Sequence, residues 1–238
     1  MKSEGKVQYE IVRSSRRRRL ALRITDDAKI VVCAPNRISI RTIEQFVSSH
    51  KPWIEQKTKE LQQLPKALSA HTYEDGDTFL YLDELLSLQI VRKITKKTTC
   101  MKVDGYLIVT APSSATKNAI KKAIVTWYRN SGIQLYEKLV AKWIGEIGYA
   151  RFAQPIFVDM AHFPKRWGSC SHKGQLRFAL RSLLLPIALV DYLALHEVGH
   201  LLHFNHGAAY KRLLDTHMPD WRERQQAMNR LRLRTATL

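Results

Sequence analysis

Two histidines and a glutamate stand at the spacing of a helical metal site in the segment from His196 to His200, which reads His-Glu-Val-Gly-His. Residues four apart on a helix share a face, so both imidazoles can reach one ion. A glutamate beside the first histidine can orient and deprotonate a water molecule at that ion. Apolar neighbours would bury this helix and keep the site dry; they are Leu193, Leu195, Val198, Leu201 and Leu202. The segment therefore predicts a catalytic metal site with Glu197 as general base.

His206 is the expected third ligand, because it follows His200 at the distance found in HExxHxxGxxH metalloproteases. Three imidazoles with one open coordination position are typical of catalytic zinc, whereas structural zinc takes four protein ligands. We therefore expect one Zn²⁺ per chain. Because His203 replaces the turn glycine of the longer pattern, we expect the chain to bend at Phe204-Asn205, with the asparagine in the left-handed conformation.

Two other side chains remain open as the third ligand. His203 lies three residues after His200 and would need a different helix face. Glu223 belongs to a later predicted helix, and in another zincin branch a glutamate so placed completes the site.

The glycine at position 199 needs an explanation, because a glycine inside a helix costs about 1 kcal/mol relative to alanine. We expect a neighbouring strand to approach the helix closely at this position.

Composition indicates a folded, strongly basic protein. The 238 residues carry a net charge of +18 with 45% hydrophobic residues. This charge favours polyanions such as nucleotides or nucleic acids as partners, although a basic surface without any specific partner fits equally well. Residues 151–238 hold 13 Lys and Arg against 6 Asp and Glu, and the first 150 hold 26 against 15, so the surplus of positive charge scales roughly with length.

Localisation is predicted to be cytoplasmic. The amino-terminal residues lack an apolar stretch that would suggest a secretory signal, and no run is apolar enough to predict a membrane span. The three cysteines are far apart, which favours a reducing compartment over a disulfide framework or a thiolate zinc site.

The periodicity of apolar residues predicts an α+β fold. The expected division is a β-rich region with packed helices over residues 1–113, followed by a zincin-like catalytic domain over residues 114–238 that carries the HExxH helix. In the first region we expect a hairpin or meander over 7–35, helices from Ser39 and from Pro52 to Leu64, a connector over 61–76, and strands over 78–82 and 87–94. In the second region we expect a helix over 114–148 closed by Gly148, a strand over 156–159, a loop over 167–170 and a strand over 175–180. Helices over 186–205, 208–216 and 219–233 are expected to follow.

A weak internal repeat lies in the first region. Ile30 to Pro35, then a predicted helix and Trp53, is echoed by Leu107 to Pro112, then a predicted helix and Trp127. In each copy we expect the helix to carry its tryptophan onto the sheet. The alternative is that Val-x-Ala-Pro is merely a frequent way for a chain to leave a strand.

The chain resembles the YgjP-like family of zinc metallopeptidases, which are related to the SprT-like and Wss1-like zincins. The motifs that carry the resemblance are Arg166-Trp-Gly-Ser-Cys170, Leu176-Arg-Phe178, Leu183-Leu-Leu-Pro186, Asp191-Tyr192, the His196 to His200 segment and Asn205-His206, together with the Arg16 to Arg23 strand and the Val-x-Ala-Pro segment. The resemblance covers nearly the whole chain. It implies a zincin-like domain with three histidine ligands and Glu197 as general base, and a 166–170 loop near the metal.

Two segments depart from the family pattern. Gly199 replaces a larger residue inside HExxH, and Gly207 to Tyr210 replaces a serine and an aromatic residue after the third histidine. The expected ligands stay intact, so the departures concern the substrate pocket. For that pocket the sequence suggests Arg166, Trp167, Ser169 and Arg177, since an arginine beside a metal can hold a carboxylate or phosphate. Trp167 fits equally well as a core aromatic residue.

Three functions remain open at this point. The first is a metallopeptidase that hydrolyses peptide bonds, with a strand such as residues 175–180 pairing with the peptide substrate. The second is a metal-dependent nucleotide phosphoanhydride hydrolase (a nucleoside triphosphate pyrophosphatase), with Arg166, Arg177 and Arg181 neutralising phosphate charge, although no Walker-type loop is present. The third is a DNA-associated protease recruited by its basic surface. The sequence does not indicate an oligomeric state.

Overall fold

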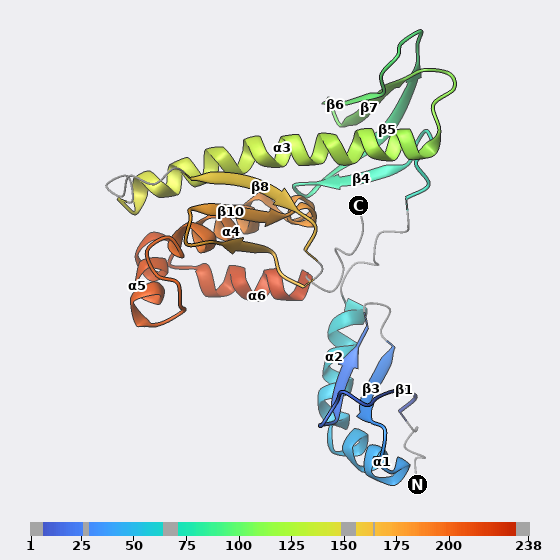
Figure 1. The fold of residues 1–238 in the computed structure, drawn as a ribbon, viewed down its shortest axis with the longest axis vertical. Coiled ribbons are helices and arrows are strands. Elements are labelled where there is room, and N and C mark those ends of the chain that lie inside the picture. Colours follow the sequence, from blue (N-terminus) through green and yellow to red (C-terminus); the bar gives the residue numbers. More distant parts are fainter. Residues whose placement is uncertain (1–6, 26–28, 64–70, 149–155, 164, 232–238) are drawn as a thin grey trace. The chain divides into compact units, whose positions relative to one another are not determined.

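The computed structural model describes residues 7–25, 29–63, 71–148, 156–163 and 165–231. Two compact units are present, residues 1–69 and residues 70–238 (Figure 1). The division therefore differs from the one expected between residues 113 and 114. Its physical cause is a shared core, since Phe79 and Val109 belong to the same buried cluster as Leu193 and Val198 of the histidine-bearing helix. The predicted α+β class is confirmed.

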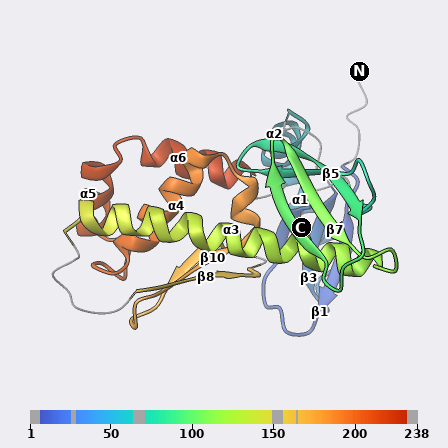
Figure 2. The ribbon, with the colours of Figure 1, turned by 90° about the horizontal axis from the view of Figure 1, so that it is seen from above.

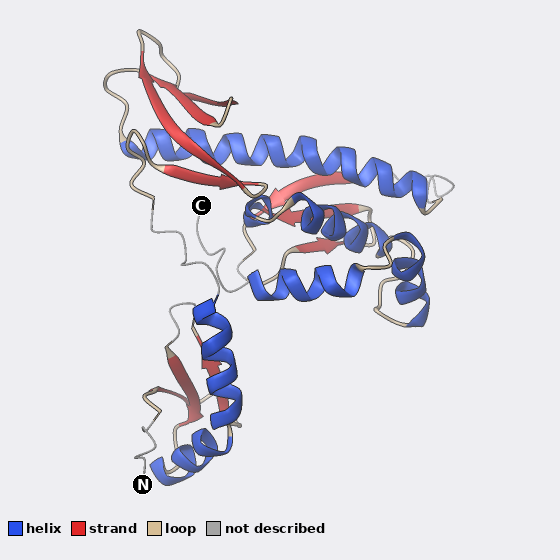
Figure 3. Cartoon of the chain, turned by 180° about the vertical axis from the view of Figure 1, so that it is seen from behind, coloured by secondary structure: helices blue, strands red, loops and turns tan. Residues whose placement is uncertain are grey.

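The first unit is a small sheet covered by two helices on one face (Figure 3). Its elements are β1 (Glu10–Ser14), β2 (Ala21–Ile24), β3 (Ile30–Pro35), α1 (Ile40–Ser49) and α2 (Lys51–Gln63). β3 is the central strand; it pairs with β2 as the expected antiparallel hairpin, but with β1 in parallel, so the region is not a simple meander. The core consists of Val32, Ala34, Ile43, Val47 and Ile54.

The second unit begins with a four-stranded sheet that packs on a long helix. The strands are β4 (Thr78–Tyr81), β5 (Glu84–Arg92), β6 (Thr99–Val103) and β7 (Tyr106–Ala111), in the spatial order β4-β5-β7-β6. The helix α3 (Lys117–Glu146) begins after Thr116, whose side chain accepts a hydrogen bond from the Ala119 N–H, and ends before Gly148 at φ 69°. It runs past both sheets of the unit (Figure 2).

The two copies of the sequence repeat share one topology. In each copy the first strand lies parallel to the third, and the second pairs antiparallel with the third: β1-β3-β2 in one and β5-β7-β6 in the other. One arginine in each copy holds the turn after the third strand. The Arg13 Nη1 donates to the carbonyl of Pro35 at 3.2 Å, and the Arg92 Nη1 to that of Pro112 at 2.9 Å. Val-x-Ala-Pro thus ends equivalent strands in the two copies.

The tryptophans of the repeat behave differently. Trp127 packs against Tyr81 with ring centroids 4.9 Å apart, as a residue carried onto the sheet should. Trp53 is 41% exposed, so the expectation for that copy is wrong. The cause is the helix break at His50, because Trp53 lies in the second helix and only Ile54 of that turn enters the core.

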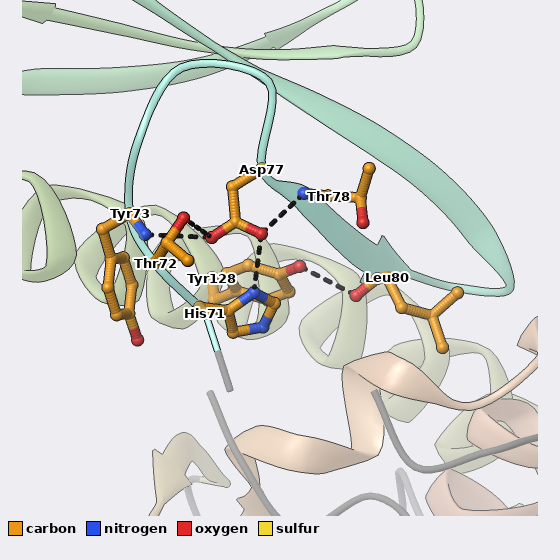
Figure 4. A network of polar contacts seen from close by, with 7 residues as sticks. All are labelled: His71, Thr72, Tyr73, Asp77, Thr78, Leu80 and Tyr128. Carbon is orange, nitrogen blue, oxygen red and sulfur yellow. Dashed lines mark hydrogen bonds and ion pairs between the residues drawn. The ribbon is translucent and has the colours of Figure 1, made fainter. Parts of the chain in front are cut away.

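A polar network fixes the start of the second unit (Figure 4). Asp77 accepts hydrogen bonds from the backbone N–H groups of Tyr73 at 2.9 Å and Thr78 at 2.8 Å, and lies 3.5 Å from the His71 Nδ1. Burial acts to raise the pKa of Asp77, but these hydrogen bonds together outweigh it and hold the pKa below its ordinary value. On α3, the Tyr128 hydroxyl donates to the Leu80 carbonyl at 2.8 Å. The segment is thereby held against the helix.

The remaining elements surround the histidine-bearing helix. They are β8 (Phe157–Ala161), β9 (Gly168–Cys170), β10 (Gln175–Ala179), a 3₁₀ turn (Leu180–Leu184), α4 (Ile187–Gly199), α5 (Ala208–His217) and α6 (Trp221–Leu231). The sheet order is β8-β10-β9, so the segment expected as a loop is a short edge strand. α4 contacts α3, α5, α6 and β9. It ends at Gly199, earlier than the expected Asn205.

Parts of four predicted elements lie outside the described residues: residues 26–28 of the 7–35 hairpin, the end of the helix at Leu64, residues 64–70 of the 61–76 connector and the last two residues of the 219–233 helix. Within the described chain, no helix has the length and apolar character needed to cross a membrane.

Candidate metal centre

Three imidazoles converge at the carboxyl end of α4. One nitrogen atom of each of His196, His200 and His206 lies within 4.8 Å of those of the other two. The Nε2 atoms of His196 and His206 are 3.3 Å apart. α4 supplies His196, its carboxyl-terminal cap residue supplies His200 four positions later, and the chain leaving the helix returns His206. The three nitrogen atoms lie close enough together to bind one ion.

Hydrogen bonds to the other ring nitrogens leave the Nε2 atoms available. The Nδ1 of His196 lies 3.4 Å from the Tyr192 hydroxyl, and the Nδ1 of His200 lies 3.0 Å from the His203 carbonyl. A ligand histidine in a metalloprotein is oriented in this way by the partner of its other nitrogen. Burial, followed by the neighbouring imidazoles, lowers the pKa of His196 to about 3. A neutral ring keeps its lone pair free for a metal ion.

Tyr210 of α5 lies beneath all three rings. Its ring stacks on that of His200, with centroids 4.8 Å apart, and makes edge contacts with those of His196 and His206. Its hydroxyl donates to the His196 carbonyl at 3.0 Å. This buried ring therefore fixes the relative positions of the imidazoles.

Glu197 points from the same helix into the protein and is only 4% exposed. Burial raises the pKa of its carboxyl group to about 8, and the positive charge of Arg166 opposes that rise. Such a shift gives the group a proton affinity suited to exchange near neutral pH. A cation held by the three imidazoles would favour the ionised form.

The raised pKa predicts how the stability of the metal-free protein depends on pH. Between about pH 4.5 and 8 the folded state holds a proton on Glu197 that the unfolded state has released. Stability contributed by this group therefore falls as pH rises through that window. We expect Glu197→Gln to increase the free energy of unfolding of the metal-free protein, with a gap over the wild type that widens toward pH 8.

Urea unfolding in a chelator at several pH values measures this gap. The two proteins differ only at residue 197, so a gap that changes with pH reports on the proton held by Glu197. Parallel stability curves without a widening gap would contradict the buried, proton-holding state of Glu197.

The edge strand β9 passes directly over Glu197 at Gly168. A Cβ atom at this position would clash with the Oε1 of Glu197. The prediction that a strand approaches the helix at Gly199 is wrong. A Cβ at Gly199 would instead lie 3.1 Å from Cε2 of Tyr210, so this glycine makes room for the aromatic ring beneath the histidines.

Adding one methyl group at residue 168 should therefore be costly. We expect Gly168→Ala to lower the free energy of unfolding by about 1–3 kcal/mol, because Glu197 or the strand must shift. Gly145→Ala is the matched control, since a Cβ there meets no atom within 4 Å and alanine favours the helix. Chemical denaturation of both variants checks this; equal stability would show that β9 yields without cost.

The alternative ligands do not join the three imidazoles. Among the described residues that could hold a metal ion, the group contains neither His203 nor Glu223. His203 contributes its backbone carbonyl to His200, and Glu223 is exposed in the first turn of α6. Asn205 also does not adopt the expected left-handed conformation, because it is not among the described residues with positive φ. The helix already ends at Gly199, so the chain turns before reaching residue 205.

Only part of the predicted substrate-binding set borders the site. Arg166 is exposed and close enough to act on the charge of Glu197. Ser169 pairs with Arg177 across β9 and β10, whereas Gly168, which faces Glu197, pairs with Phe178. Because successive side chains alternate between faces, Ser169 and Arg177 start on the opposite face of the sheet.

Trp167 and Arg177 instead belong to aromatic contacts around the loop. Trp167 is buried, and the Arg181 guanidinium carbon lies 4.5 Å from its ring centroid. Phe163 has the guanidinium carbon of Arg166 at 4.2 Å and that of Arg177 at 5.4 Å. The core-aromatic alternative for Trp167 thus agrees with its burial.

Sequence reasoning missed the two tyrosines that support the imidazoles. Tyr192 lies one helical turn before His196, a spacing that could have indicated the contact. Tyr210 carries no such signal, because its contact with α4 depends on how α5 packs.

The geometry defines a histidine site able to hold a metal ion beside a buried carboxyl group, which is the class of site that metal-dependent hydrolases use. Comparison with protein families agrees with this class. The model described as YgjP-like, metallopeptidase domain, matches residues 18–231. Because the match spans most of the chain, the protein belongs to the YgjP-like family and is a peptidase-like hydrolase.

Other comparisons add little. No curated protein matches the chain. A crystal structure of the metallopeptidase zymogen abylysin from Pyrococcus abyssi is similar over 40% of this chain and 94% of its own, with 22% identity and a TM-score of 0.36. A likeness this weak does not bear on the fold or the site.

Proposed function

We propose that this protein is a zinc-dependent peptidase in which His196, His200 and His206 hold one Zn²⁺ and Glu197 is the general base. The observation that carries the proposal is the convergence of three imidazole nitrogens beside a buried carboxyl group on the same helix. Three nitrogen donors with an open position match catalytic zinc. When bound, zinc supplies Lewis acidity that polarises a carbonyl group and acidifies water.

Glu197 performs the proton transfers in this proposal. Its carboxylate accepts a proton from the attacking water and then gives that proton to the amine that leaves the cleaved peptide bond. The shielded position under β9 keeps the carboxyl group from exchanging its proton freely with bulk water. Arg166 acts on the same carboxyl group and limits the rise of its pKa.

The substrate is proposed to pair with β9. The segment at residues 175–180, named from the sequence as the pairing strand, cannot serve, because β10 is bonded to β8 on one side and β9 on the other. β9 is an edge strand, it contacts α4, and Gly168 lies over the general base. A peptide added to such an edge would have its backbone held next to Glu197.

Nucleotide phosphoanhydride hydrolysis remains the second candidate, and one observation favours it: Arg166 is an exposed cation close to Glu197. Three arginines were named for this role from the sequence. Arg177 starts on the far face of the sheet, and Arg181 lies over Trp167 and donates to the Arg166 carbonyl at 3.3 Å. The site therefore offers fewer cations to a triphosphate than the sequence suggested.

A paired assay separates the two functions. Zinc-loaded protein is incubated with an unfolded protein and, separately, with nucleoside triphosphates, and new amino termini and released phosphate or pyrophosphate are measured. We expect new amino termini and no release above background. Release from the triphosphates without peptide cleavage would replace the proposal by its alternative.

We also propose a reducing compartment, such as the cytoplasm. Cys33, Cys100 and Cys170 are all free thiols. Structural disulfides would be expected in an oxidising compartment.

A further inference from the structure

Positive charge is more concentrated in the first unit, residues 1–69, than in the second. Residues 1–69 hold 15 Lys and Arg against 7 Asp and Glu, and residues 70–238 hold 24 against 14. The first unit thus carries a surplus of 8 in 69 residues, and the second a surplus of 10 in 169.

Strand register brings the arginines of this unit to one end of its sheet. β1 pairs with β3 from Glu10 and Val31 to Ser14 and Pro35, so both strands finish at the same end. β2 runs the other way and begins there, with Ala21 opposite Cys33. The β1–β2 connection, the β3–α1 connection and the start of α1 therefore meet at this end. They carry Arg16, Arg17, Arg18, Arg19, Arg37 and Arg41, which we call the arginine end.

No acidic side chain forms an ion pair with the arginine end among the described residues, including Glu44, which lies three residues after Arg41 on α1. Glu10 lies at the opposite end of β1. All six arginines are exposed, and none forms an ion pair within the part of the chain that the structure describes. Arg13 is excluded from the group because it donates to three backbone carbonyls of the β3–α1 turn.

The second copy of the repeat provides an internal comparison. Its equivalent connection, between β5 and β6, carries Lys93, Lys96 and Lys97. There, however, acidic residues lie beside the equivalent end: Glu74 pairs with Lys117 at 2.5 Å and lines one hollow together with Arg92. The same topology thus carries partly compensated charge in one copy and uncompensated charge in the other.

We propose that the arginine end binds the phosphate backbone of a nucleic acid. A guanidinium group donates two parallel hydrogen bonds to a phosphate, and six exposed arginines match the repeated charges of a phosphate backbone better than the single charge of one carboxylate. The side chains are all exposed and come from three segments, which fits an extended chain of phosphates rather than one enclosed ion. This binding is separate from the hydrolytic site, since it uses no residue of the second unit.

The test measures binding of a labelled DNA duplex and a labelled single strand to the full-length chain by fluorescence anisotropy over a series of salt concentrations. About six phosphate contacts predict a slope of log K against log salt near −5 for the duplex. Replacing Arg16, Arg17 and Arg18 by glutamine should make the slope shallower by about 3 and weaken binding at 0.1 M salt by more than about tenfold.

The matched control is the triple variant Lys93→Gln, Lys96→Gln and Lys97→Gln, which removes the same charge from the equivalent connection of the other copy. It should bind DNA as the wild type does, and both variants should keep the wild-type circular dichroism spectrum and peptide cleavage. Equal losses in the two variants would show that total charge alone is responsible and overturn the proposal. Binding of polyglutamate or of anionic phospholipid vesicles as tight as that of DNA, at the same salt concentration, would also overturn it.

Discussion

Glu197→Gln is expected to reduce kcat/KM for a peptide substrate by about 10²- to 10⁴-fold, the range that a positioned general base contributes. Glutamine has nearly the same size and can remain under β9, but it cannot accept a proton from water. The three imidazoles do not depend on this side chain, so zinc content should stay at one ion per chain.

Glu223→Gln provides the comparison, because it removes one carboxylate from an exposed position on α6. Turnover and zinc content are measured for both variants by steady-state kinetics and elemental analysis. A Glu197→Gln protein that keeps both its zinc and its full turnover would remove Glu197 from the mechanism. Loss of turnover in Glu223→Gln instead would return that residue to consideration.

His206→Ala is expected to weaken zinc binding by more than about 100-fold. Removing a residue that only hydrogen-bonds a metal ligand already weakens metal binding by about 10- to 100-fold, and removing the ligand itself should cost more. The site would keep the imidazoles of His196 on α4 and of the cap residue His200, and lose the one that the following turn supplies. His206 is also exposed, so its replacement leaves no cavity in the core. The loss should therefore appear in metal affinity rather than in the stability of the metal-free fold.

His203→Ala is the matched variant, because it removes an imidazole three residues away while keeping the backbone carbonyl that His200 contacts. Competition with a chromophoric chelator gives the zinc affinity of each variant. We expect His203→Ala to bind zinc within a few-fold of the wild type. The opposite order of affinities would make His203 the third ligand and contradict the arrangement of the three rings described above.

The elements around the site could be predicted where the signals are local. The long α3 follows from its apolar periodicity, its capping threonine and Gly148, all within one stretch of chain. The His196 and His200 pair follows from helical spacing alone, and His206 from the length of the turn that returns to the helix. These features depend on neighbours in sequence, so their residue types carry the information.

Features that depend on packing between distant segments were predicted poorly. β9 has three residues, too few to show an alternating pattern, and exists because β10 pairs with it. The reason for Gly199 lies in Tyr210, and the close approach of a strand occurs at Gly168 instead. The sequence suggests Arg177 for the substrate pocket, but the register of β10 places its side chain on the face of the sheet opposite to Glu197.

The sequence by itself determined which imidazoles can meet at one point, because histidines that share one end of a helix are encoded by short, fixed spacings. It also determined the α+β class and the existence of a repeated strand-proline-helix segment. Only the tertiary structure decided where the units divide, which strand borders Glu197, and which arginines gather at one end of a sheet. Those outcomes depend on strand register and shared cores, in which each residue's position is set by partners far along the chain.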